Sequence, residues 1–346
     1  MKAYQLVAWE QPPELREVPV PEPGPGQVLL RVAGAGACHS DLHLMEWEAG
    51  VLPFDVPFTL GHENAGWVEA VGAGVEGWSR GDAVAVYGAW GCGRCRECRA
   101  SRETLCERQT ELGVYGGGLG LDGGMADYML VPDTRLLIAL GDMDPVEAAP
   151  LTDAALTPYH AIKRSLHLLV PGSTAVVIGV GGLGHMAVQI LRAVSPARIV
   201  AVDLAPDKLA LAREVGADEV VESGDGATEA LRELTAGHGA ELVLDFVGAA
   251  PTIALAAQSV RMGGDVAVVG LAGGRFEFGF GAIPYDATIT IPYWGAAIEL
   301  MEVLALARRG AIRAHVERFP LERVGEAYER LRDGSLEGRA VVVPHT

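Results

Sequence analysis

The sequence predicts an α/β protein of two domains, one a doubly wound parallel sheet and the other a mostly β domain. At 346 residues the chain is too long for one ordinary hydrophobic core, so two domains are expected. From Met1 to about Pro150, short alternating apolar runs separated by glycine and proline indicate strands and turns. After Leu151, buried-strand runs alternate with helical patterns, which is typical of a parallel sheet with helices on both faces.

The expected elements follow this order along the chain. The first domain should contain strands at residues 27–33, 66–71 and 83–87. In the second domain, apolar runs predict strands at residues 174–179, 198–203, 241–246, 265–270 and 287–292. Amphipathic patterns between the strands predict helices at residues 185–194, 205–215 and 227–235. Two further helices, 298–309 and 324–332, should return the chain to the first domain, so the expected domains are 1–150 with 291–346, and 151–290.

The composition excludes some classes of partner. Hydrophobic residues make up 49% of the chain and charged residues 21%, as in ordinary globular proteins without long disordered tails. With 27 lysines and arginines against 45 aspartates and glutamates, the formal net charge is -18. A surface so acidic repels phosphate backbones and anionic lipid, so neither nucleic acid nor a membrane is an expected partner.

Three further observations bear on the compartment. The N-terminus lacks a basic start followed by an apolar stretch, so no export signal is expected. The apolar run at residues 174–191 has the length of a membrane span, but its glycines and His185 suit a strand, a turn and a helix better. The cysteine count is five, and four cysteines lie within residues 92–106, which favours metal ligation over disulfides and fits a reducing cytoplasm.

A glycine motif indicates a dinucleotide site. Its four glycines follow a predicted strand and open a predicted helix, and they are Gly179, Gly181, Gly182 and Gly184. Asp203 ends the next predicted strand, 19 positions after the last glycine. This is the fingerprint of a Rossmann domain in its required context, with a merely tight structural turn as the alternative. The glycines permit close backbone approach, the helix N-terminus attracts pyrophosphate, and the Asp203 carboxylate holds the ribose hydroxyls.

The residues around Asp203 favour NAD over NADP. The carboxylate would repel a ribose 2′-phosphate, and the next residues, Leu204 and Ala205, offer no positive charge. Lys208 lies close enough in sequence to keep this preference from being absolute, and we include it among the candidate cofactor-binding residues.

A cluster of cysteines predicts a structural zinc site. The spacing is C-x2-C-x2-C-x7-C, in a lobe expected at about residues 88–113, formed by Cys92, Cys95, Cys98 and Cys106. Four thiolates so spaced can close a tetrahedron around zinc. An iron-sulfur site and disulfides are the alternatives, but nothing else in the chain indicates electron transfer or secretion. Because four protein ligands leave no open position, a reactive metal has to lie elsewhere.

Cys38 and His62 are candidates for such a reactive site. Cys38 begins the run C-H-S-D-L-H, and His62 stands in the run G-H-E some twenty residues later. A thiolate and an imidazole form half of an open zinc site. In isolation, a small buried cysteine and a hydrogen-bonded core histidine would be the favoured interpretation, and the surrounding motifs reverse that preference.

The segment around His62 resembles the signature of a known family. The pattern Gly61-His62-Glu63-x2-Gly66-x5-Gly72-x2-Val75 is similar to the signature of the zinc-containing medium-chain alcohol dehydrogenases. The order of the motifs is similar over essentially the whole chain, most of all to bacterial secondary-alcohol dehydrogenases. The resemblance implies a GroES-like catalytic domain beside the Rossmann domain, with zinc and NAD as cofactors and two zinc ions per chain.

The resemblance also implies roles for residues near the reactive zinc. The third ligand is often cysteine in the family, whereas this chain has Asp153 at the matching position, similar to a known variant. Glu63 is implied to be a catalytic carboxylate close to the metal, and Asp41 to orient the His62 imidazole, with ordinary surface charge as the alternative. Ser40 and His43 are implied to relay the proton of the alcohol to water, although His43 is also compatible with a plain surface histidine.

Other positions match cofactor contacts of the family. Thr157 and Leu183 would pack on the nicotinamide, and Arg339 would contact the pyrophosphate. The alternatives are core packing for Leu183 and a solvated surface arginine for Arg339. Family members assemble as dimers or tetramers through the cofactor-binding domain, so a homo-oligomer is expected.

The expected activity is reversible hydride transfer between NAD and a small or medium secondary or primary alcohol, giving a ketone or aldehyde. Candidate aromatic residues for an apolar substrate pocket, equally compatible with plain core packing, are Phe54, Tyr293, Trp294 and Trp47. A polyol or sugar dehydrogenase of the same family is the enzymatic alternative. A zinc- and NAD-binding protein without catalysis is the alternative from another class.

Overall fold

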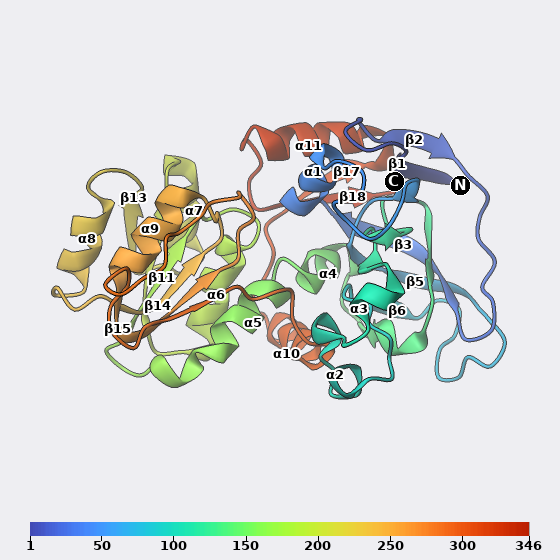
Figure 1. The fold of residues 1–346 in the computed structure, drawn as a ribbon. Helices are drawn as coiled ribbons and strands as arrows, with labels where there is room; N and C mark the ends of the chain where they lie inside the picture. Colours follow the sequence, from blue (N-terminus) through green and yellow to red (C-terminus); the bar gives the residue numbers. More distant parts are fainter. Residues whose placement is uncertain (346) are drawn as a thin grey trace. The chain divides into compact units, whose positions relative to one another are not determined.

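The computed structural model describes residues 1–345, which form two compact units (Figure 1). Unit 1 comprises Met1–Leu156, Gly295–Arg308 and the chain from Ala314 onward, and unit 2 comprises Thr157–Trp294 and Arg309–Arg313. Within residues 1–345, no helix is both long and apolar enough to cross a membrane.

Unit 1 is built around a seven-stranded sheet. Its strands run in the order β10-β6-β5-β3-β18-β17, with β9 also paired to β3. The bounds are β3 Val28–Gly36, β5 Glu63–Val71, β6 Ala83–Val86, β9 Tyr128–Val131, β10 Leu137–Ala139, β17 Val316–Pro320 and β18 Arg339–Val343. Two smaller sheets consist of β2 Glu14–Glu17, β1 Lys2–Leu6 and β4 Phe58–Thr59, and of β7 Gly116–Gly117 with β8 Gly120–Leu121. Because β18 pairs with β3, a strand near the C-terminus joins the sheet formed by strands within residues 28–139.

Within residues 1–150 of unit 1, short helices interrupt the predicted pattern of strands and turns, and they are α1 His39–Glu46, α2 Arg96–Arg99, α3 Gln109–Leu112 and α4 Pro145–Ala148. The two helices predicted at residues 298–309 and 324–332 are confirmed as α10 Ala297–Arg308 and α11 Val324–Arg332. The start of α1 is stabilised because the Asp41 carboxylate accepts a hydrogen bond from the backbone N–H of Cys38 at 3.0 Å. In α11, an apolar stripe at helical spacing packs inward, formed by Val324, Ala327, Tyr328 and Leu331.

Unit 2 is a doubly wound sheet of six parallel strands in the order β13-β12-β11-β14-β15-β16. The strands are β11 Thr174–Ile178, β12 Arg198–Asp203, β13 Glu219–Glu222, β14 Ala240–Asp245, β15 Val260–Val268 and β16 Thr288–Thr290. The helices are α5 Leu156–Arg164, α6 Gly184–Val194, α7 Pro206–Glu214, α8 Ala227–Leu234 and α9 Ala250–Ser259. The predicted fold class is confirmed. The strand order reverses between β11 and β14, the point where such sheets bind ligands at their carboxyl edge.

Some elements of unit 2 differ from the sequence prediction. α5, β13 and α9 were not among the predicted elements. β13 is a half-exposed strand with a glutamate at each end, and α9 is apolar on most faces. β15 begins at Val260, before the predicted start at residue 265. Its early part contains Gly263 at φ 70° and a register shift against β14, and glycine weakens the sequence signal of a strand.

Candidate functional site

Four potential metal ligands meet in the interior of unit 1. The side chains of Cys38, His62, Glu63 and Asp153 are all buried, and their ligating atoms lie within 4.8 Å of one another. Cys38 follows β3 and His62 precedes β5, and these strands are paired at Gly36 and Glu63. Asp153 follows directly on the short 3-10 helix Ala149–Thr152, which contacts both strands. The sheet therefore joins donors from three separate parts of the sequence.

The distances in this cluster suit a small cation. The Asp153 Oδ2 atom lies 3.8 Å from Cys38 Sγ and 3.7 Å from His62 Nε2. Tetrahedral zinc with bonds of 2.0–2.3 Å places its ligand atoms about 3.5 Å apart. Sulfur, imidazole nitrogen and carboxylate oxygen are all zinc ligands, so Cys38, His62 and Asp153 fit zinc both in chemistry and in spacing.

Asp41 holds the His62 ring. Its Oδ1 atom lies 3.1 Å from His62 Nδ1, so this nitrogen donates to the carboxylate and Nε2 faces the cluster. Burial lowers the pKa of His62, but Asp41, Asp153 and Cys38 raise it well above its ordinary value. Ser40 Oγ lies 3.3 Å from His62 Nε2, so the predicted proton acceptor stands at the edge of the donor cluster.

Glu63 and Arg339 form a buried ion pair beside the cluster. Arg339 Nε donates to Glu63 Oε2 at 2.9 Å, Arg339 Nη2 donates to Glu63 Oε1, and the two side chains are only 2% and 0% exposed. Burial acts to raise the pKa of Glu63, whereas the charge and the hydrogen bonds of Arg339 act to lower it. A Cβ atom on Gly36 would lie 1.7 Å from Glu63 Oε2, so only glycine leaves room for this carboxylate.

The position of Arg339 bears on its predicted contact with pyrophosphate. Its guanidinium points to Glu63, and Nη2 also lies 3.6 Å from Asp153 Oδ2. The arginine is therefore buried among carboxylates rather than solvated. Its contact with a cofactor stays a prediction.

The four remaining cysteines form a second donor cluster in unit 1. The sulfur atoms of Cys92, Cys95, Cys98 and Cys106 all lie within 4.8 Å of one another, and Cys92 Sγ is 3.9 Å from Cys98 Sγ. Backbone N–H groups donate to these sulfurs, as from Cys95 to Cys92 at 3.3 Å. Hydrogen bonds from the backbone of Arg94 and Cys95 lower the pKa of Cys92 to about 6. Four sulfurs in this arrangement fit a closed tetrahedral zinc site.

The glycine motif of unit 2 forms the turn between β11 and α6. Gly179 has φ 84°, and a Cβ atom on Gly184 would lie 1.9 Å from the Gly179 carbonyl oxygen. A Cβ atom on Gly181 would meet nothing within 4 Å, so the loop is open on that side. The Asp203 carboxylate at the end of β12 accepts from Val180 N at 2.7 Å and lies against the loop. The arrangement suits a pyrophosphate at the helix N-terminus with Asp203 beside the ribose.

The other candidate cofactor residues lie in both units. In unit 2, Thr157 is buried at the start of α5, Leu183 is half-buried at the start of α6, and Lys208 is buried in α7. Arg339 alone lies in unit 1.

The candidate pocket residues fall into separate groups. Phe54 is buried in unit 1, with its ring centroid 5.5 Å from Phe58, and so belongs to an aromatic core cluster. Tyr293 and Trp294 lie in unit 2, with centroids 6.0 Å apart, and Trp294 is buried with φ 55°.

On α1, the candidate proton-relay residue lies beside an aromatic side chain. The His43 ring stacks on the ring of Trp47, which follows the helix, with centroids 6.1 Å apart. His43 is half-buried. Its part in a proton relay stays a prediction.

One residue near the cluster was not predicted. The Tyr328 hydroxyl of α11 donates to Asp41 Oδ2 at 2.9 Å, and Tyr328 is 2% exposed. The apolar stripe of α11 indicates that Tyr328 faces the interior, where a tyrosine hydroxyl needs a partner. Nothing in the local pattern identifies Asp41 as that partner.

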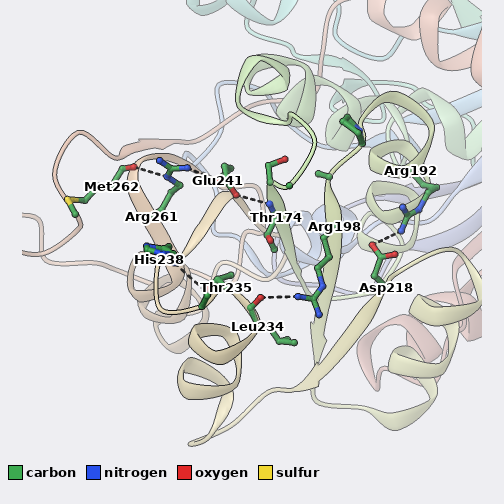
Figure 2. A pocket seen from close by; sticks show the side chains of 16 residues that line it. Thr174, Arg192, Arg198, Asp218, Leu234, Thr235, His238, Glu241, Arg261 and Met262 are labelled. Carbon is green, nitrogen blue, oxygen red and sulfur yellow. Dashed lines mark hydrogen bonds and ion pairs between the residues drawn. The ribbon is translucent and has the colours of Figure 1, made fainter.

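A separate pocket of about 840 Å³ opens at the amino ends of β11 and β12 (Figure 2). This is the edge of the sheet opposite the glycine motif. Its arginines are paired within the pocket, Arg192 with Asp218 at 2.6 Å and Arg261 with Glu241 at 2.8 Å. Arg198 also donates to the Leu234 carbonyl at the end of α8. The charged groups thus neutralise one another and the helix end.

Comparisons with known proteins define the family. Residues 24–142 match the alcohol dehydrogenase GroES-like domain, and residues 182–306 match the zinc-binding dehydrogenase domain. An NAD-dependent alcohol dehydrogenase from Sulfurisphaera tokodaii is 36% identical, over 99% of this chain and 100% of the relative. A D-arabinose 1-dehydrogenase (NADP(+)) from Saccharolobus solfataricus is 33% identical, over 99% of this chain and 97% of the relative.

A solved structure extends the similarity to the fold. The crystal structure of the alcohol dehydrogenase from the hyperthermophilic archaeon Aeropyrum pernix is 36% identical, with a TM-score of 0.91 over 99% of this chain and 100% of the other. The chain belongs to the zinc-binding medium-chain alcohol dehydrogenase family.

Proposed function

We propose that this protein is a zinc-dependent alcohol dehydrogenase that transfers a hydride between NAD and a small or medium secondary or primary alcohol. The observation that carries the proposal is the buried donor set Cys38, His62 and Asp153, beside which the fourth nearby donor, Glu63, is paired with Arg339. A zinc site with three protein ligands is the open, catalytic type. Family membership and the glycine motif of unit 2 support the dehydrogenase activity.

The proposed roles follow from the contacts around the donor set. Zinc held by Cys38, His62 and Asp153 would polarise the substrate oxygen as a Lewis acid. Asp41 orients His62 through the hydrogen bond to Nδ1. Ser40, next to the cluster, accepts the proton of the alcohol.

Two other side chains complete the proposed active site. His43 passes the proton received by Ser40 on to water. Glu63 keeps the negative charge of a buried carboxylate close to the cluster because Arg339 pairs with it. It therefore contributes to the electrostatic field at the metal.

The proposed cofactor is NAD, bound at the glycine motif with the adenosine ribose on Asp203. The position of this carboxylate against the loop and the NAD-dependent relative from Sulfurisphaera tokodaii support it. In this proposal Thr157 and Leu183 pack on the nicotinamide, Arg339 contacts the pyrophosphate, and Lys208 belongs to the part of the cofactor site around Asp203.

The proposed substrate is an apolar alcohol, with a sugar as the second candidate. Tyr293 and Trp294 would favour an apolar alcohol over a polyol, whereas Phe54 packs in the aromatic core cluster of unit 1. The relative that is named a D-arabinose 1-dehydrogenase favours a sugar as the second candidate. Purified protein with zinc and NAD should therefore be tested on secondary alcohols, primary alcohols and aldoses while NADH absorbance is followed.

The expected result is turnover of secondary alcohols with higher kcat/KM than of any sugar. Faster oxidation of aldoses would replace the substrate assignment by the sugar alternative. No turnover of any substrate by zinc-loaded protein would favour a zinc- and NAD-binding protein without catalysis.

We further propose a homo-oligomer in the cytoplasm. β16 lies at the edge of the sheet of unit 2. Ile291, which follows β16 directly, is 80% exposed, and Phe278 and Phe280, in the segment of chain before β16, are 74% and 96% exposed. Large exposed apolar side chains beside a sheet edge suit contact with a second copy. Light scattering should give a dimer or tetramer, and a monomer would contradict this. Five cysteines without a disulfide among them suit a reducing compartment.

A further inference from the structure

The Asp41 carboxylate receives hydrogen bonds from three different parts of unit 1. Oδ1 accepts from His62 Nδ1 at 3.1 Å, and Oδ2 accepts from the Cys38 backbone N–H at 3.0 Å. The third donor is the Tyr328 hydroxyl, at 2.9 Å from Oδ2. Asp41 is 0% exposed and Tyr328 2%, so neither group exchanges these partners for water.

Tyr328 brings this contact from the far end of the chain. It lies on α11, 287 residues after Asp41, and α11 packs against α1. Its ring stacks on the ring of Tyr4 in β1, with centroids 6.0 Å apart and an interplanar angle of 17°. Because the ring is held by this packing, the hydroxyl has one position. Burial and the Asp41 charge raise the pKa of Tyr328 well above its ordinary value, so the hydroxyl keeps its proton and donates.

The two anchors on Oδ2 determine where Oδ1 points. A carboxylate on a short side chain can rotate about its Cβ–Cγ bond, and rotation would move Oδ1 away from His62. The backbone N–H of Cys38 and the Tyr328 hydroxyl oppose that rotation from two directions. Without the Tyr328 hydroxyl, only the Cys38 N–H holds Oδ2. The Asp41 carboxylate can then rotate, and the His62 imidazole is held less firmly in one orientation.

We propose that Tyr328 is a positioning residue for the reaction: through Asp41 it orients the His62 imidazole toward Cys38 and Asp153 and so sets the geometry in which these side chains hold the metal. This inference rests on the proposed catalytic zinc site and extends it to a residue that touches neither metal nor substrate.

The variant Tyr328→Phe tests the hydroxyl alone, because it keeps the ring and its stacking. Tyr4→Phe is the matched control, since it removes a hydroxyl from the other ring of the same stacked pair and leaves the Asp41 contact intact. Full-length proteins are loaded with cobalt(II). The inner site is the proposed metal site formed by Cys38, His62 and Asp153, and its absorption is taken as the difference between the spectrum of each protein and that of a Cys38→Ala protein. Zinc-loaded proteins are then challenged with a chromogenic chelator.

Tyr328→Phe should shift the absorption of cobalt(II) at the inner site and weaken metal retention there about 10-fold. This is the lower end of the loss of metal affinity that follows when a hydrogen-bond partner of a metal ligand is removed. It should lower kcat for alcohol oxidation with the KM for NAD unchanged. Tyr4→Phe should match the parent protein in all three measurements. In an Asp41→Asn background, adding Tyr328→Phe should have no further effect on metal retention, because the hydroxyl acts through that carboxylate.

Identical cobalt(II) spectra and chelator rates for Tyr328→Phe and Tyr4→Phe would overturn the inference, whatever the thermal stability of the two proteins. So would fully additive effects of Tyr328→Phe and Asp41→Asn. A parent protein that binds cobalt(II) at Cys38 yet oxidises no alcohol would refute the proposed function while the spectra still decide the role of Tyr328.

Discussion

The buried ion pair between Glu63 and Arg339 gives a sharp prediction about stability. Replacing Arg339 by methionine keeps most of the side-chain volume but removes both hydrogen bonds to Glu63. The carboxylate is 0% exposed, so water cannot reach it to take over. Breaking a buried pair by removing one partner typically costs about 3–5 kcal/mol, because the other charge stays buried. We expect Arg339→Met to lower the free energy of unfolding by about that amount.

Urea unfolding followed by intrinsic fluorescence measures the effect. Adding Glu63→Gln to Arg339→Met should recover part of the loss, since it removes the unpaired charge. The matched control is Arg318→Met. Arg318 also pairs with a glutamate, Glu147 at 2.8 Å, but its side chain is 53% exposed. An exposed pair contributes about 0–1 kcal/mol, so this variant should unfold close to the parent protein.

Equal stability of Arg339→Met and Arg318→Met would refute this reasoning. If Arg339→Met kept the stability of the parent protein and raised only the KM for NAD, the main role of Arg339 would be to bind the cofactor. Its contact with Glu63 would then contribute little to the fold.

Three other predictions concern the cofactor, the proton and the metal. Asp203→Ser should narrow the preference for NAD over NADP in kcat/KM, and equal efficiency of the parent protein with both cofactors would contradict the role of Asp203. Ser40→Ala should slow alcohol oxidation roughly 10²- to 10⁴-fold, whereas near-normal rates with zinc and NAD bound would exclude the relay. Because the pKa of His62 in the metal-free protein is raised, protons compete with metal, so affinity for zinc at the inner site should fall as pH decreases. Chelator extraction at about pH 6 should therefore be faster than at about pH 8, and a rate independent of pH would contradict this.

Much of unit 2 could be predicted from local patterns. The glycine motif and the apolar runs identify β11, α6 and β12 because each carries its own signal within a few residues. The helix expected at residues 324–332 is confirmed as Val324–Arg332 in unit 1 for the same reason. β13 carries no such signal, since an edge strand with glutamates at both ends looks like a loop in sequence.

The site was predictable to the extent that motifs mark its residues. The cysteine spacing and the segment around His62 each indicate metal ligands, and the structure places the proposed ligands together. The partners of these residues could not be found in this way. Glu63 and Arg339 are separated by 276 residues, and periodicity within one element carries no information about such a contact.

The measurement that tests the central claim most directly is the metal content of the purified protein and of two single variants. The account predicts about two zinc ions per chain, one at the four cysteines and one at the cluster that includes Cys38. Cys38→Ser should stay folded with about one zinc ion and lose alcohol oxidation, whereas Cys95→Ser should chiefly lose stability. A single zinc ion in the parent protein, or a Cys38→Ser protein that keeps its second zinc ion and its activity, would contradict the account.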